Sequence, residues 1–288
     1  MVLTNYYKSI LLFFICLCLS LPSFAQKKGR YLVYFKDKKN SPYSFKQAEA
    51  FLSARSLQRR LKQEIQVNAQ DLPVNPSYLK GIQDKNVKVQ GASRWLNAAL
   101  VEADESQLAG LESLDYVWKI SDLLINRKAQ EGSNMNTNIY KDPEGEPPSL
   151  SINDLPDYGK AKPQVQMLGA DQMHKDGYRG QGMLIAVLDA GFIKVDELSF
   201  FRHLFENGRI KDAYDFVEYD NNPYHGSEHG LMVLSTIAAY KPGEIIGTAP
   251  EADFLLYRTE DSSTEFRIEE VNWLMAAERA DSAGVDVI

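Results

Sequence analysis

Apolar strands that alternate with helices after residue 160 constrain the fold of this 288-residue chain more than any other feature. Residues 183–191 read Met-Leu-Ile-Ala-Val-Leu-Asp-Ala-Gly, an apolar strand that runs directly into a carboxylate. A helix is expected from residue 229, a strand over 254–257, a long helix over 265–283 and the start of another strand over 285–288. Strands separated by helices predict an α/β fold with a parallel sheet and flanking helices.

Two residues that can carry chemistry lie at the ends of these elements. Asp189 ends the first strand, and Glu228-His229-Gly230 opens an apolar, small-residue helix. Ligands and catalytic groups of open α/β sheets gather where strands end and helices begin. A serine hydroxyl becomes a nucleophile when an imidazole takes its proton, and a carboxylate must orient that imidazole. Spacing alone leaves a triad pair open beside a turn-capping Asp and a packed or solvated His.

Gly177, Gly180 and Gly182 lie just before the strand that ends at Asp189. A dinucleotide-binding fingerprint needs its glycines after a strand and at the start of a helix, where amide groups meet the pyrophosphate. Their position before the strand therefore argues against nucleotide binding.

Four ordered sequence blocks resemble those of the subtilases, the subtilisin-like serine proteases. They match, in order, the segments around the catalytic Asp, the His-bearing helix, the turn and strand after it, and the lead-in to the substrate-binding strand: residues 180–191, 228–239, 247–257 and 283–288. The resemblance implies a partial subtilisin-like sheet in which His229 is the general base and then the general acid. Asp189 would orient His229, and a polypeptide substrate would bind as an added strand along a sheet edge.

The same resemblance implies a serine nucleophile that residues 1–288 do not contain. The Gly-Thr-Ser nucleophile block and the oxyanion-hole Asn are expected beyond Ile288, and Gly247-Thr248 is followed by Ala249 where Ser is needed. We therefore expect a secreted serine endopeptidase zymogen of subtilisin type, truncated here and inactive as the chain stands.

Two alternatives from other classes stay open. Subtilases usually have Thr after the His-Gly pair and often a second His next, whereas this chain has Leu231 and Met232. That departure favours a non-catalytic pseudoprotease. The other alternative is a propeptide-like protein that binds or inhibits other proteases. The uncovered sheet edge of half an α/β domain counts against it.

Residues 29–122 are expected to form a separate, ferredoxin-like α+β domain. Four strand patterns occur, over 31–35, from 87, over 96–101 and over 116–120. Asp104 and Gln107 predict the capped start of one helix. Ser44 and Gln47 predict the capped start of another, whose inward face would carry Ala50, Ala54, Leu57 and Leu61. The order β-α-β-β-α-β is that of a ferredoxin-like fold.

By position and topology this domain resembles the inhibitory propeptide of subtilases. The resemblance implies that it acts as an intramolecular inhibitor and folding chaperone, and an unrelated accessory domain is the alternative. Residues 123–160 lack periodicity and are rich in Asn, Ser, Glu and Pro, which predicts a linker that contains the processing site. Residues 161–288 would then be the N-terminal half of the catalytic domain.

The first 25 residues predict a cleaved signal peptide. Lys8 precedes an apolar core, and Ser23-Phe24-Ala25 supplies the small residues of a cleavage site. The protein is therefore expected to be secreted, or held at the cell surface or in the periplasm, with no stable membrane span after signal removal. The only cysteines, Cys16 and Cys18, lie in this segment, so the mature chain has no thiol chemistry. The net charge of −7 argues against a nucleic-acid partner.

The remaining charged residues predict no required cofactor. Asp215, Glu218 and Asp220 could contribute to a structural calcium site, which the family often has, although the EF-hand spacing is missing. His225 is expected to be a solvated loop residue, with a metal site between His225, His229 and Asp220 as the alternative. Arg59-Arg60 is either a processing site or a pair of solvated charges on a helix.

Overall fold

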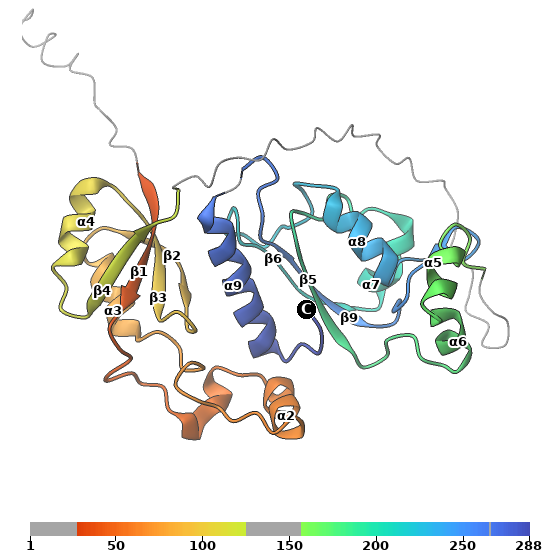
Figure 1. Cartoon of the computed structure of the whole chain (residues 1–288), viewed down its shortest axis with the longest axis horizontal. Helices are drawn as coiled ribbons and strands as arrows, with labels where there is room; N and C mark the ends of the chain where they lie inside the picture. Colours follow the sequence, from red (N-terminus) through yellow and green to blue (C-terminus); the bar gives the residue numbers. More distant parts are fainter. Residues whose placement is uncertain (1–27, 125–156, 265) are drawn as a thin grey trace, which may run out of the picture.

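Residues 29–122 form a four-stranded antiparallel sheet with helices on one side (Figure 1). The computed structural model describes residues 28–124, 157–264 and 266–288. The strands lie in the order β2-β3-β1-β4. The elements of this part are β1 (Gly29–Phe35), the 3-10 helix η1 (Phe45–Ala50), α2 (Ala54–Lys62), α3 (Pro76–Gln83), β2 (Lys88–Ser93), β3 (Ala98–Ala103), α4 (Glu105–Glu112) and β4 (Val117–Asp122).

The helix that packs between β1 and β2 is α3, and the sequence-based assignment of the helix after Ser44 is wrong. The chain breaks between η1 and α2, and Leu61, predicted to face inwards, is 82% exposed. Ile82 of α3 is fully buried in the core of this sheet, with Tyr78 and Leu79 packed against it. The missed signal is Asn75-Pro76, an N-cap residue followed by a proline in the first turn.

The second helix agrees with the prediction. Asp104 accepts a hydrogen bond from the amide of Gln107, and the Gln107 side chain accepts one from the amide of Asp104. This capping box starts α4, which buries Leu111 in the same core. The order β-α-β-β-α-β of a ferredoxin-like fold is thus confirmed, with η1 and α2 as an insertion.

The second part of the chain contains a three-stranded parallel sheet in the order β5-β9-β6, as the alternation of strands and helices predicts. Val287 extends it through a parallel bridge to Ile185 on the other side of β5. The elements are α5 (Lys162–Met167), α6 (Ala170–Lys175), β5 (Leu184–Asp189), the 3-10 helix η2 (Ser199–Phe201), α7 (Arg202–Glu206), β6 (Ile210–Asp215), α8 (His229–Ala238), β7 (Tyr240–Lys241), β8 (Ile245–Ile246), β9 (Asp253–Arg258) and α9 (Arg267–Ala283). Sequence patterns did not predict β6, because this half-exposed edge strand carries charges at Lys211 and Asp212.

Helices cover both faces of the parallel sheet. Val187 and Leu256 point to the face covered by α7 and α8, whereas Ala186 and Leu255 point to the face covered by α9. From β5 to β6 the chain moves across the sheet in one direction, and from β6 to β9 it moves back, yet both connections lie on the α7–α8 face. The crossover through α8 therefore has the opposite hand to the one through α7, an exception to the usual uniform handedness.

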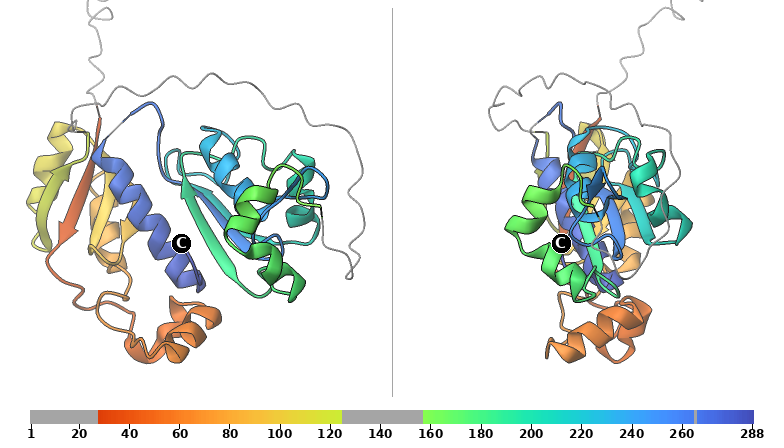
Figure 2. Two further views of the ribbon diagram at one scale, coloured as in Figure 1. Left: turned by 45° about the vertical axis from the view of Figure 1, so that its right-hand side comes forward. Right: turned by 90° about the vertical axis from the view of Figure 1, so that its right-hand side faces the viewer.

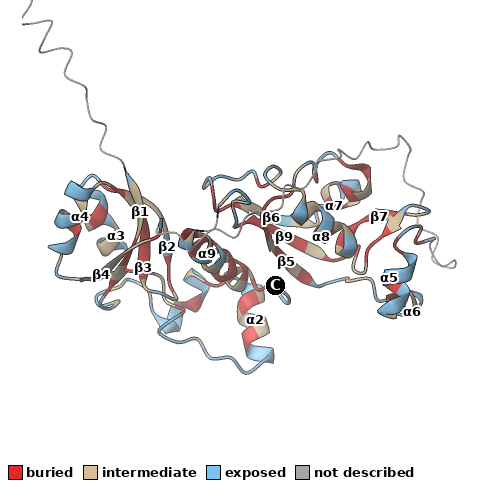
Figure 3. Cartoon of the chain, turned by 45° about the horizontal axis from the view of Figure 1, so that its top comes forward, coloured by how far each residue is buried: buried red, intermediate tan, exposed pale blue. Residues whose placement is uncertain are grey.

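The two parts share one apolar core, because α9 lies between their sheets (Figure 2). Leu32 and Leu100 of the antiparallel sheet belong to the same buried cluster as Val271 and Met275 of α9. Buried residues are spread along the length of α9 (Figure 3). No helix in the described ranges combines the length and apolar character that a membrane span requires. The predicted signal peptide and most of the predicted linker lie outside the described residues.

Candidate functional site

Asp189 and His229 lie together at the carboxyl end of the parallel sheet. Asp189 is the last residue of β5, and His229 is the first residue of α8. The Nδ1 atom of His229 is 3.0 Å from Oδ1 and 2.9 Å from Oδ2 of Asp189. The two candidate catalytic residues of the sequence analysis are thus within hydrogen-bond distance of each other.

The surroundings of the two side chains differ in a way that suits proton transfer. Asp189 is buried, and its Oδ1 also accepts a hydrogen bond from the amide of Ala190 at 2.7 Å. The side chain of His229 is 58% exposed. Because an ionised carboxylate can only accept hydrogen bonds, Nδ1 carries the hydrogen and the lone pair of Nε2 is left to take a proton. The pair can therefore act as an oriented base.

A glycine directly after His229 allows α8 to approach the end of β5. A Cβ atom on Gly230 would lie 2.3 Å from the carbonyl oxygen of Gly191 and 3.0 Å from the Cβ of Asp189. Real Cβ atoms do not approach backbone oxygens so closely, so any larger residue here would push the helix away from the strand. The distance between Asp189 and His229 depends on this glycine.

Arg258 joins the ends of all three parallel strands. It ends β9, in register with Asp189 on one side and Asp215 on the other. Its Nη1 donates to Oδ2 of Asp215 at 2.8 Å, and its Nε donates to the carbonyl of Ala190 at 3.2 Å. The sequence analysis missed Arg258; the available signal was a cation directly after the apolar run Phe254–Tyr257.

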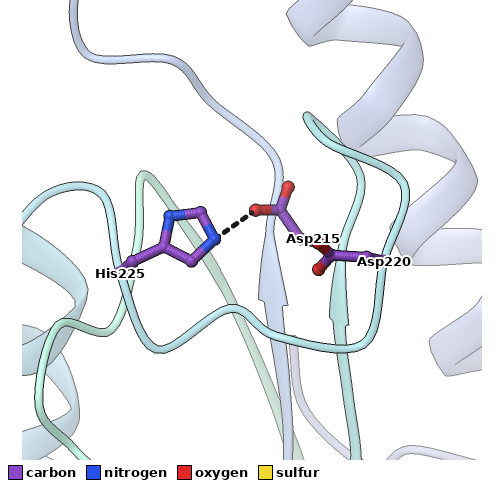
Figure 4. A group of neighbouring side chains, drawn as sticks. All are labelled: Asp215, Asp220 and His225. Atoms are coloured by element: carbon purple, nitrogen blue, oxygen red, sulfur yellow. Dashed lines mark ion pairs between the residues drawn. The ribbon is translucent and has the colours of Figure 1, made fainter.

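Asp215, Asp220 and His225 lie beside this arginine and offer ligand atoms within 4.8 Å of one another (Figure 4). The Nε2 atom of His225 is 3.2 Å from Oδ2 of Asp215. His225 is therefore not the solvated loop residue that the sequence predicts, because it pairs with a fully buried carboxylate. The alternative set with His229 does not form in the described chain, where His229 pairs with Asp189.

The cluster of Figure 4 does not fit a calcium ion. Oδ1 of Asp215 already accepts the amides of Val217 and Glu218, and Oδ2 faces Arg258 and His225. Calcium prefers six to eight oxygen ligands, and one of the three donors here is an imidazole nitrogen. The buried Asp215 instead accepts hydrogen bonds from its own loop and neutralises Arg258.

The other residues singled out from the sequence have structural positions. Leu231 packs into the core on the α7–α8 face, and Met232 is 44% exposed on α8. Gly177, Gly180 and Gly182 precede β5; a Cβ on Gly180 would lie 2.9 Å from the Cβ of Ala252. At Gly180 the small residue thus permits close packing.

Two family models match the chain. Residues 30–138 match the peptidase S8 propeptide domain of Bacteroidota, and residues 180–288 match the subtilase family. These matches agree with the resemblance drawn from the four sequence blocks and with the order of the two domains.

Individual relatives agree with the family models. Subtilisin E of Bacillus subtilis (strain 168) is 30% identical over 213 residues, which cover 72% of this chain and 45% of the relative. The minor extracellular protease Vpr of the same strain is 31% identical over 130 residues, 42% of this chain and 15% of that protein. The chain thus spans less than half the length of these relatives.

A solved structure is also similar. The epidermin leader peptide processing serine protease (EpiP) of Staphylococcus aureus aligns with a TM-score of 0.46 at 15% identity, over 88% of this chain and 47% of that one. On the two family matches and the subtilisin relatives, the chain belongs to the subtilase family and is a precursor that carries its propeptide domain.

Proposed function

We propose that the chain is the N-terminal part of a secreted, subtilisin-type serine endopeptidase, in which Asp189 and His229 are two members of an Asp-His-Ser triad. The observation that carries the proposal is the 2.9 Å contact between Nδ1 of His229 and the buried carboxylate of Asp189. The third member, a serine, would follow Ile288 in the longer protein.

The proposed chemistry follows from the orientation of His229. Its Nε2 takes the proton from the serine hydroxyl as the serine oxygen attacks the substrate carbonyl, and the imidazolium that forms is stabilised by Asp189. Nε2 then gives the proton to the leaving amine, and water releases the acyl group in the second half of the reaction. The substrate would be a polypeptide that adds a strand to a sheet edge.

Residues 29–122 would act as an intramolecular inhibitor and folding chaperone of this domain. The match of residues 30–138 to a subtilase propeptide supports this role, as does the core that the two parts share at α9. Processing between about residues 120 and 160 would separate the two parts, since the composition there is the easiest for a protease to cut.

The first test is to read the coding sequence beyond Ile288 and to express the complete protein. Release of the propeptide would be followed by electrophoresis, together with peptidase activity. His229→Ala should abolish both, and Asp189→Asn should lower kcat by about 10⁴-fold, because the imidazole then loses its tautomer and its counter-charge. Glu228→Gln, one residue away, is the matched control and should process normally.

Two outcomes would contradict the proposal. Normal processing and activity in His229→Ala, with no other protease present, would remove His229 from the mechanism. A complete protein without a Gly-Thr-Ser block would instead support a pseudoprotease, the reading that Leu231 and Met232 favour.

A further inference from the structure

The propeptide domain contacts the rest of the chain at a second place, away from the apolar face of its sheet. Helix α2 and the residue before it lie at the C-terminal end of α9, as Figures 1 and 2 show from different sides. α2 turns a polar side towards α9, because its buried residues are Ser56 and Arg60. This contact involves the inserted segment that the ferredoxin-like order does not require.

Five consecutive carbonyl groups at the end of α9 accept hydrogen bonds from this segment. The last carbonyls of a helix have no partner within the helix and must find one elsewhere. Here the donors are the Ser56 hydroxyl to Asp281 (2.8 Å), the Ser53 amide to Ser282 (2.9 Å), the Ser53 hydroxyl to Ala283 (2.8 Å), Arg55 Nε to Gly284 (3.0 Å) and Arg59 Nη1 to Val285 (2.7 Å). The propeptide domain therefore supplies an external cap for α9.

The charges at this end also need the propeptide domain. The last turn of α9 contains no basic residue, while Glu278 and Asp281 are acidic. Carboxylates near a helix C-terminus are unfavourable because the helix dipole is negative there. The propeptide domain compensates, since Asp281 forms ion pairs with Arg59, Arg60 and Arg94.

Three further contacts complete the cluster. Arg55 pairs with Asp286, just after the helix. The carboxylate of Glu278 accepts the Ser93 hydroxyl and the amide of Arg94 at 2.5 and 2.8 Å. Burial alone would raise the pKa of Asp281, but hydrogen bonds from Arg59 and Arg60 hold it below its ordinary value, so the carboxylate remains charged. Arg59 and Arg60 are therefore neither solvated nor accessible to a processing protease here.

We propose that residues 53–60, together with Arg94, form the recognition element by which this propeptide domain holds its protease domain. Its partner is a helix end of defined chemistry: carboxylates and no cation in the last turn, followed by a left-handed glycine that admits α2. The element makes the propeptide selective for protease domains with this helix end. The inference builds on the proposed inhibitor role of residues 29–122, but the binding itself does not require catalysis.

The test uses the full 288-residue chain with a site for a sequence-specific protease placed within residues 125–156. After cleavage, the dissociation constant of the two fragments is measured, and co-elution on size exclusion gives a first reading. Asp281→Asn should weaken retention about 100-fold or more, because three buried arginines lose their counter-charge. Lys62→Gln, on the exposed side of α2, is the matched control and should stay within about twofold.

A pair of glycines provides a second measurement. Gly284 and Gly177 have φ of +87° and +90°, but a Cβ on Gly284 would lie 2.4 Å from the amide nitrogen of Ser56, whereas nothing lies within 4 Å of one on Gly177. Both alanine variants carry the same backbone strain. Only Gly284→Ala should weaken fragment retention.

If Asp281→Asn fails to fold, Ser56→Ala removes one hydroxyl and should weaken retention about fivefold. Retention in Ser56→Ala and Gly284→Ala within about twofold of the Lys62→Gln control would overturn the proposal and leave the apolar sheet face as the holding surface. Because retention is measured without peptidase activity, failure of the proposed triad would leave this result unaffected.

Discussion

At the scale of single residues, the Asp189–His229 contact depends on a position with no side chain. Gly230→Ala would place a methyl group against the Gly191 carbonyl and the Asp189 side chain. We expect a loss of about 1–3 kcal/mol of unfolding free energy from overpacking, and displacement of α8 from β5. Chemical denaturation measures the first effect, and NMR contacts between the two side chains measure the second.

Gly110→Ala is the matched control for that substitution. Gly110 lies within α4, and a Cβ there would meet nothing within 4 Å. It should raise stability by about 0.5–1 kcal/mol, because alanine loses less conformational entropy in a helix. Equal effects of the two variants would show that Gly230 has no special contact.

A buried histidine outside the site should make stability depend on pH. Burial lowers the pKa of His203 below its ordinary value, only partly offset by its hydrogen bond to the Pro250 carbonyl. The unfolded chain then binds more protons than the folded one below about pH 6.5, so stability is full above that pH and falls on acidification. We expect the loss of unfolding free energy between pH 7 and pH 5 to be smaller in His203→Gln than in the wild type. Identical pH profiles would contradict this.

At the scale of secondary structure elements, the insertion between β1 and α3 changes which helix supports the antiparallel sheet. Ile82→Ala in α3 should cost about 2–5 kcal/mol, because it leaves a cavity in a fully buried site. Leu61→Ala in α2 should change stability by less than about 0.5 kcal/mol, since that side chain is exposed. Urea denaturation of both variants distinguishes this arrangement from the one that sequence periodicity predicts.

The comparison of these helices explains what the sequence could predict. Spacing of apolar residues fits α2 as well as a core helix, but arginines at 59 and 60 and serines at 53 and 56 bind a helix far away in the sequence, which periodicity cannot reveal. By contrast, Asp189 and His229 could be predicted, because each lies at the end of a strongly patterned element. Arg258 could not, since its partners meet only when three strands are aligned.

At the scale of the whole molecule, the core shared through α9 should make the two domains unfold together. Trp95 and Trp118 lie in the antiparallel domain, and Trp273 lies on α9. Fluorescence of a Trp273→Phe variant reports on the first domain, and fluorescence of a Trp95→Phe/Trp118→Phe variant reports on α9. Once each variant's curve is matched to its own far-UV circular dichroism, both probes should give a single coincident transition. A separate transition for either probe would indicate independent domains.

The position of β9 sets an order of events during synthesis. Asp189 and His229 both leave the ribosome before β9, yet β5 and β6 do not pair with each other, and β9 is inserted between them. A nascent chain that ends before Arg258 therefore has both members of the pair but no sheet to hold them. The candidate site is assembled by a strand that is made after the residues it positions.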